Sequence, residues 1–161
     1  MYVPFSEMPD HARVWFYQCD RAMTVEEVEV ISAFLLNFTE QWTAHQNDLK
    51  ASFTVLYDRF IILTVDERQA GASGCSIDSS VRAIQGIEKE LNLSLFDRTV
   101  IHYRDGEGIG TMNLSAFQEA LARGQVTDET IVFNNMVESV GDLNQNWEVP
   151  VKHSWHSQLM A

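Results

Sequence analysis

The sequence predicts an α+β fold of the ferredoxin-like kind: a four-stranded antiparallel sheet with two helices on one face, in the order βαββαβ. β-rich runs and amphipathic helical runs alternate in that order over the first 110 residues. Two of the β-rich runs are separated by only two residues, which indicates an antiparallel hairpin. At 161 residues the chain has room for one domain core with a small appendage rather than for two full domains.

The first strand and the first helix have clear signals. Residues 13–18, RVWFYQ, are rich in β-branched and aromatic side chains and predict a strand. Thr24 is followed three positions later by Glu27, which is the capping-box pattern of a helix start. The helix is expected to run to about residue 43, because its apolar residues recur three and four apart: Val28, Ile31, Leu35, Phe38 and Trp42.

The central elements follow after a polar turn at residues 44–48. Residues 50–57 and 60–66 predict the hairpin, joined by Asp58-Arg59. The second of these runs is nearly all apolar, which is typical of a central strand covered on both faces. An amphipathic helix is then expected from about Ile77 to Asn92, and residues 99–103 predict the fourth strand of the sheet.

The last fifty residues predict an extension of this core. Residues 114–123 predict a short helix that ends at Gly124, and residues 130–133 predict a short strand. Residues 146–155 hold two tryptophans without periodicity, and we expect this tail to wrap onto the body because exposed tryptophans are costly. The expected organisation is a core of residues 1–110 and an extension of residues 111–161, packed as one compact domain.

Charge and composition exclude several classes of function. The formal net charge is −12, which repels phosphate backbones and anionic lipid surfaces, so neither nucleic-acid nor membrane binding is predicted. The N-terminal residues lack a signal-peptide pattern and no run approaches a membrane span, so a cytoplasmic protein is expected. Cys19 and Cys75 have no metal-ligand spacing, and no cofactor or metal is predicted.

Under the predicted topology, polar residues gather at one end of the sheet. That end receives His11 and Arg13, the turn at 45–48, residues 66–78 and residues 104–107. Cys19 lies at the opposite end, so a disulfide between Cys19 and Cys75 is not expected. The acidic residues of this end also offer oxygen ligands for a divalent cation, but their spacing is not that of a calcium loop, and a solvated turn or helix cap is the preferred interpretation: Asp66, Glu67 and Asp78.

Cys75 is the candidate reactive residue, within the stretch ASGCSIDSSVR at residues 72–82. A thiol at a helix N-terminus is favoured as thiolate by the free amides and the helix dipole. In the catalytic hypothesis His45 acts as its base, oriented by Asp66 or Asp78. In the structural alternative the stretch is a glycine turn whose polar side chains cap the helix, and the sulfur is incidental: Ser76, Ser79 or Asp78.

Several segments together resemble a small uncharacterised bacterial family whose members often carry the label "ABC transporter ATPase": residues 2–5, 8–10, 12–15, 72–78, 96–99, 132–135 and 146–150. The resemblance covers nearly the whole chain, and the family brings no established catalytic residues. ATP hydrolysis is not predicted, because phosphate cradling of that type needs the motif GxxxxGK[ST] and no lysine follows a glycine here.

Two classes of function remain. The first is a cytoplasmic, non-catalytic binding or regulatory module for a protein partner, a second copy of the chain or a small ligand. The second is a thiol-dependent enzyme or redox sensor centred on Cys75. The first is preferred because no catalytic set with firm spacing is present in the sequence.

Overall fold

The computed structural model describes residues 1–160 and shows an α+β fold with antiparallel sheets. The chain divides into two compact units. Unit 1 consists of Met1–Phe96 and the later segment Glu138–Gly141, and unit 2 consists of Asp97–Val137 and the chain from Asp142 onward. The boundary predicted between core and extension lies near residue 110, whereas the compact units divide between Phe96 and Asp97.

Unit 1 is built on a three-stranded antiparallel sheet in the order β1-β5-β4. The strands are β1 (Arg13–Gln18), β4 (Lys50–Leu56) and β5 (Phe60–Asp66), and all seven residues of β5 are buried. The hairpin and the central position of its second strand are thus confirmed. Alternation along β5 sends Ile61 and Leu63 to one face, and Phe60, Ile62 and Thr64 to the other.

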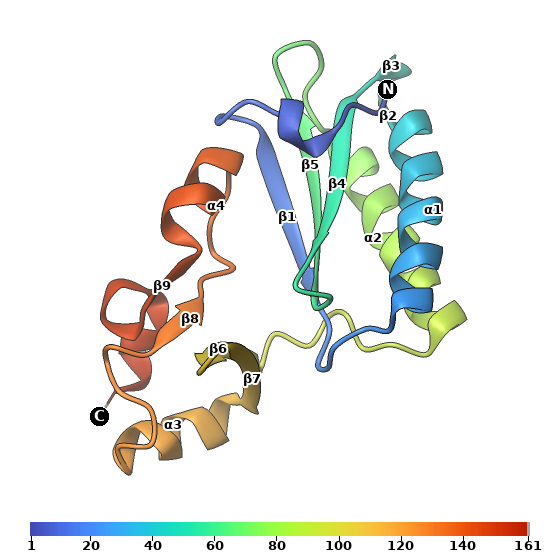
Figure 1. Ribbon diagram of the computed structural model, residues 1–161. Helices are drawn as coiled ribbons and strands as arrows, with labels where there is room; N and C mark the ends of the chain where they lie inside the picture. Colours follow the sequence, from blue (N-terminus) through green and yellow to red (C-terminus); the bar gives the residue numbers. More distant parts are fainter. Residues whose placement is uncertain (161) are drawn as a thin grey trace. The chain divides into compact units, whose positions relative to one another are not determined.

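The two long helices cover one face of this sheet, as Figure 1 shows. They are α1 (Val25–Gln41) and α2 (Gly74–Leu91). The predicted capping box of α1 is present: the Glu27 amide donates to Thr24 Oγ1 at 3.1 Å, and the Thr24 amide donates to Glu27 Oε1 at 2.8 Å. Apolar residues from both helices and the sheet form the core between them: Ile31, Leu35, Ile61, Leu63, Ile84 and Ile87.

Both edges of the sheet carry further backbone pairing. Beside β4, the Val3 amide donates to the Ala51 carbonyl at 2.9 Å, and the chain then passes through η1 (Phe5–Glu7) across the end of the sheet to β1 (Figure 1). Beside β1, the Val14 amide donates to the Glu138 carbonyl at 3.0 Å, and the Val140 amide donates to Ala12 at 2.9 Å. The open edges that invite strand pairing with other chains are therefore short.

The structure differs from the predicted four-stranded sheet at the last strand. The strand expected at residues 99–103 is β6 (Val100–Asp105), and it lies in a second sheet of order β7-β6-β8-β9. The reason is a local partner, because only Gly106 and Glu107 separate β6 from β7 (Gly108–Asn113), which pairs with it along its whole length. Two glycines in β7 weaken its β-strand signal in the sequence.

Unit 2 contains the remaining elements: α3 (Leu114–Ala122), β8 (Ile131–Phe133), α4 (Val140–Asn146, whose first two residues belong to unit 1), β9 (Glu148–Pro150), η2 (Val151–His153) and η3 (Trp155–Leu159). The end of α3 is as predicted, since Gly124 follows it with a φ of +75°. The core of this unit consists mainly of aliphatic residues around one phenylalanine: Ile101, Phe117, Ala120, Val126, Val132 and Val151.

The tail packs onto unit 2 through its aromatic residues. Trp147 is buried, with its ring centroid 5.0 Å from that of Phe133 and its indole nitrogen donating to Asn135 Oδ1 at 2.9 Å. Trp155 is half-buried and stacks on His156 at 3.9 Å. Both tryptophans thus anchor the tail. In residues 1–160, no helix combines the length and the apolar character that crossing a membrane requires.

Candidate functional site

The predicted polar end of the sheet exists around the carboxylate of Asp66, the last residue of β5. Its side chain is 2 % exposed and is surrounded by basic side chains. Arg68 Nη2 lies 2.6 Å from Asp66 Oδ2, His11 Nε2 lies 3.3 Å from Oδ1, and Lys50 Nζ lies 3.9 Å from Oδ2. The topology predicts His11 and Asp66 at the same end of the sheet, and in the structure the two side chains lie within hydrogen-bond distance.

The hydrogen bonds from Arg68 define the role of Asp66. They hold the pKa of its carboxyl well below the usual range, against the opposing effect of burial. The Arg68 amide also donates to Asp66 Oδ1 at 3.2 Å, so the carboxylate fixes the turn that follows the central strand. This carboxylate stays ionised and is already committed to its partners, which suits a structural role.

Cys75 lies on the first turn of α2 and is exposed. The helix is capped by Ser73, whose hydroxyl accepts from the Ser76 amide at 3.2 Å, while the Ser73 amide donates to Ser76 Oγ at 2.7 Å. The Ser79 hydroxyl donates to the Cys75 carbonyl at 3.0 Å. The predicted helix cap is therefore present, but the capping residue is Ser73, paired with Ser76, rather than Ser76, Ser79 or Asp78 alone.

Of the proposed partners of Cys75, Asp78 shares its helix, whereas His45 and Asp66 lie on other elements. His45 lies in the turn of a small hairpin, β2 (Thr43–Ala44) and β3 (Asn47–Asp48), with a φ of 51°, and Asp78 is exposed on α2. Within residues 1–160 neither side chain, nor Asp66, hydrogen-bonds the Cys75 sulfur. The structure thus brings together His11 and Asp66, but it does not assemble a hydrogen-bonded thiol–imidazole–carboxylate set.

The predicted topology places Arg104 at the polar end of the sheet and Cys19 at the opposite end. Arg104 belongs to unit 2, where its Nε donates to Glu148 Oε1 at 2.8 Å. Cys19 is buried in unit 1 and forms no disulfide with Cys75, and burial raises its pKa. Over the described part of the chain there is no group of three or more His, Cys, Asp or Glu side chains arranged to hold a metal ion.

A groove between α1 and α2 is a feature that the sequence reading missed. Its volume is about 290 Å³, and it is lined by Phe34, Asn37, Phe38, Gln41, Trp42, Thr43 and Ser79. The rings of Phe38 and Trp42 lie 5.1 Å apart, and the Trp42 indole nitrogen donates to the Ser76 carbonyl at 2.9 Å, which ties the groove to the start of α2. Cys75 precedes Ser79 by one helical turn.

The outer surface of α1 beside this groove is unusually apolar. Val30 and Phe34, one turn apart, are 50 % and 45 % exposed. Val25 and Leu36 are 69 % and 47 % exposed, but at about 3.6 residues per turn they fall on the opposite flank of the helix from Phe34. These apolar residues lie outside the stripe that predicts the buried face of the helix. Their position outside the stripe was the signal in the sequence from which their exposure could have been predicted. Large side chains left in water on one helix are typical of an interaction surface.

No family model matches the chain, and neither a curated protein nor a solved structure shows detectable similarity to it.

Proposed function

We propose that the protein is a non-catalytic binding module that docks a basic amphipathic helix of a partner protein in the groove between α1 and α2. The observation that carries this proposal is the exposure of Phe34 and Val30 beside a groove with an aromatic floor. Amphipathic helices bind such grooves through apolar side chains spaced three, four and seven residues apart. Phe34 and the half-buried Phe38 supply the apolar contact.

The groove is held in a fixed shape by its surroundings. Trp42 is only 3 % exposed, and its ring makes an edge contact with Trp15 at a centroid distance of 5.9 Å. With its indole nitrogen bonded to the backbone of α2, this side chain is fixed at both ends. A preformed groove lowers the ordering cost of binding, which supports a docking role.

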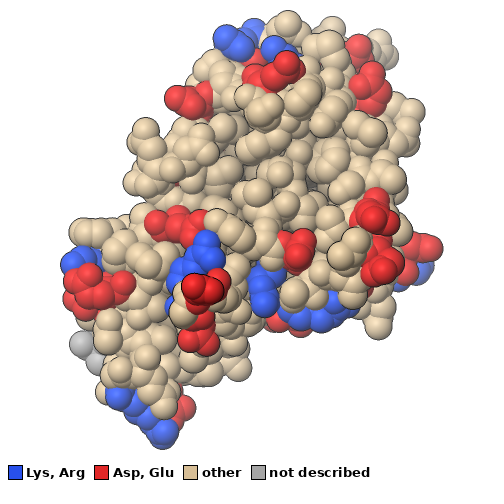
Figure 2. Space-filling model, viewed as in Figure 1, with Lys and Arg blue, Asp and Glu red and all other residues tan. Residues whose placement is uncertain are grey.

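Charge favours a basic partner over a second copy of the chain. Helix α1 carries four glutamates and no lysine or arginine. Figure 2 shows acidic side chains over this helix, and the whole chain has a net charge of −12. Two copies would repel each other, whereas Lys and Arg around the apolar face of a partner helix would be attracted.

The topology of unit 1 agrees with a ferredoxin-like body, which we propose as its fold. Its elements follow the order β1, α1, β4, β5, α2, and the three strands are arranged as the first three strands of that fold. Residues 138–140 pair with β1 at the position that the fourth strand would take. Its cytoplasmic location stays a prediction from the sequence.

The proposal is tested with a labelled synthetic peptide that carries leucines on one helical face and lysines on the other, and binding is followed by fluorescence anisotropy at low ionic strength. Replacing Phe34 with serine should weaken binding about tenfold or more, because an apolar anchor is lost. Met136→Ser is the matched control, since Met136 is 69 % exposed but lies in unit 2.

A scrambled peptide of the same composition separates groove recognition from charge attraction. Equal binding of both peptides, or an unchanged affinity in Phe34→Ser, would refute the proposal. Light scattering after size-exclusion chromatography adds a second check. A dimer of the wild type that Phe34→Ser converts to a monomer would identify a second copy as the occupant instead.

A thiol-dependent function is the second candidate, favoured by the exposure of Cys75 next to the groove. It requires that Cys75 be more reactive than an ordinary thiol, and the buried Cys19 should stay unalkylated as long as the protein is folded. The test is the rate of alkylation by iodoacetamide relative to glutathione at neutral pH. A rate about tenfold above glutathione supports this candidate, and an equal or slower rate removes it.

A further inference from the structure

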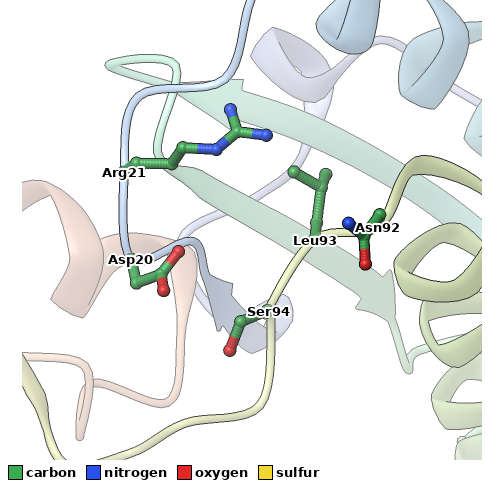
Figure 3. A pocket seen from close by; sticks show the side chains of 5 residues that line it. All are labelled: Asp20, Arg21, Asn92, Leu93 and Ser94. Atoms are coloured by element: carbon green, nitrogen blue, oxygen red, sulfur yellow. The ribbon is translucent and has the colours of Figure 1, made fainter.

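A second cavity of unit 1 lies away from the docking groove, where the connection from β1 to α1 meets the chain after α2. Its volume is about 380 Å³, and it is lined by Asp20, Arg21, Asn92, Leu93 and Ser94 (Figure 3). This volume is at the lower end of the range for small-molecule sites. Leu93 is 8 % exposed and supplies the apolar part of the lining, while the other four residues are exposed and polar.

Arg21 is held in place with part of its hydrogen-bonding capacity unused. Its Nη1 and Nη2 donate to the two carboxylate oxygens of Glu27 at 2.8 and 2.9 Å, and Nη1 also donates to the Ala22 carbonyl at 3.0 Å. Within the described chain Nε–H has no acceptor, and one Nη2–H is left beside it. These two donors form the side edge of the guanidinium, which binds a carboxylate with two parallel hydrogen bonds.

The carboxylate of Glu27 holds the Arg21 guanidinium in place and leaves the hydrogen-bond donors of its Nε–Nη2 edge unused. The hydrogen bonds from Arg21 lower the pKa of Glu27 to about 2, so the pair stays ionised at neutral pH. Glu27 is itself fixed by the capping box, in which it accepts from the Thr24 amide. In Figure 3 the Arg21 guanidinium extends across the cavity toward Leu93, and Asp20 and Ser94 lie on the other side.

The opposite side of the cavity favours a positive charge. Asp20 supplies a carboxylate, and Asn92 is the C-terminal cap of α2, where the helix dipole places partial negative charge. Ser94 and Asn92 add neutral hydrogen-bonding groups. A simple anion would be repelled by Asp20 and a simple cation by Arg21, so the cavity suits a ligand that carries both charges a short distance apart.

We infer that this cavity binds a small zwitterion of the free α-amino acid class. The ligand carboxylate pairs with the Nε–Nη2 edge of Arg21, and its ammonium group lies between Asp20 and the end of α2. An aliphatic side chain of the ligand contacts Leu93. This site is independent of the docking groove, so one can fail without the other.

Binding is tested by chemical-shift changes in the folded, full-length protein titrated with L-leucine, L-serine and L-glutamate. L-leucinamide lacks the carboxylate and N-acetyl-L-leucine lacks the ammonium group, so each should bind about tenfold or more weakly than L-leucine. Shifts confined to the cavity residues are expected for L-leucine. Absence of saturable shifts for all three amino acids at about 10 mM, or binding of either singly charged analogue as tight as that of L-leucine, would overturn the inference.

Two variants assign the two charges. Arg21→Lys keeps a positive charge but removes the two-pronged edge, and Asp20→Asn removes the negative charge while keeping the size of the side chain. Each should weaken L-leucine about tenfold or more, and Asp20→Asn should also abolish the preference for L-leucine over N-acetyl-L-leucine. Asp58→Asn is the control, because Asp58 is an exposed acid in the adjacent turn that does not line the cavity. Equal loss in this control would reduce the effect to general charge and refute the site.

Discussion

Two buried hydroxyl groups on the sheet of unit 1 offer a sharp test of its energetics. Ser52 of β4 and Thr64 of β5 are directly opposite in register, on the face away from the helices, and both are 0 % exposed. Among residues 1–160, neither Ser52 Oγ nor Thr64 Oγ1 has a hydrogen-bond partner. Replacing Thr64 with valine substitutes a methyl group for the hydroxyl and keeps the branched shape.

The expected magnitude follows from the cost of an unpaired buried hydroxyl. Such a group lowers stability by about 1–3 kcal/mol in mutational measurements, and burying the added methyl group contributes about 0.8 kcal/mol. We expect Thr64→Val to raise the free energy of unfolding by about 1–2 kcal/mol, since small packing shifts offset part of the gain. For a chain of this length the melting temperature should rise by about 3–6 °C.

Urea unfolding, followed by tryptophan fluorescence and by circular dichroism, measures the change. Thr54→Val is the matched control, because Thr54 lies one pair further along the same face of β4 and is half-buried. Its hydroxyl can be hydrated, so this substitution should change stability by less than about 0.5 kcal/mol. Ser52→Ala should stabilise by about 1 kcal/mol, independently of Thr64→Val.

A decrease in the free energy of unfolding, instead of the expected increase, would refute this prediction. If Thr64→Val and Ser52→Ala each destabilise the protein, and the double variant loses less than the sum, the two hydroxyls bond to each other across the strands in solution. A rotation of one side chain would then satisfy both groups. The premise that these hydroxyls are unpaired would be wrong.

Three further predictions concern packing and pH. Gly110→Ala should destabilise by about 1–3 kcal/mol in thermal unfolding, because a Cβ there would overlap the Tyr103 ring, with Oη at 2.5 Å, whereas Gly108→Ala should be tolerated. Asp66→Asn should lower the free energy of unfolding by about 1–3 kcal/mol at neutral pH in urea titrations, because charge-assisted hydrogen bonds are lost; an unchanged value would refute its structural role. Burial lowers the pKa of His156 to about 4 from 6.5, so the unfolded chain binds more protons between these values and stability should fall as pH drops through this window; His156→Leu should remove that part of the slope.

Local signals in the sequence predict most elements of unit 1. The bounds of β1 and the capping box at Thr24 were predicted correctly because both depend on neighbouring residues. The hairpin follows from its short connection, and β5 from its apolar run. The start of α2 was placed a few residues late, because the cap is formed by Ser73 with Ser76 at a position usually taken by glutamate or glutamine.

Pairing between distant segments escaped prediction. Nothing in residues 138–140 indicates that they would lie beside β1, since only three residues contribute and backbone groups make the bonds. The fourth strand was assigned to the wrong sheet because β7, with Gly108 and Gly110, carries little β-strand signal. Position 110 requires glycine because the ring of Tyr103 on the paired strand occupies the space of a Cβ atom. Composition does not reveal this contact.

The candidate site was predicted in part for the same physical reason. Topology alone placed His11 at the same end of the sheet as Asp66, because both flank strand ends there, but it did not indicate their contact. The exposure of Phe34 depends on where α2 packs against α1, and the free edge of Arg21 depends on its pairing with Glu27. Such features arise from three-dimensional packing and leave only a weak trace in the periodicity of a single helix.

The segment Glu138–Gly141 also determines when unit 1 can be finished during synthesis. Residues 1–96 emerge from the ribosome first, but the pairing of Ala12 and Val14 with this segment must wait for about forty more residues. Until then the β1 edge is bare, and another nascent chain can pair with it. A fragment ending at residue 96 would leave that edge open, although the core between its sheet and helices lies within residues 1–96.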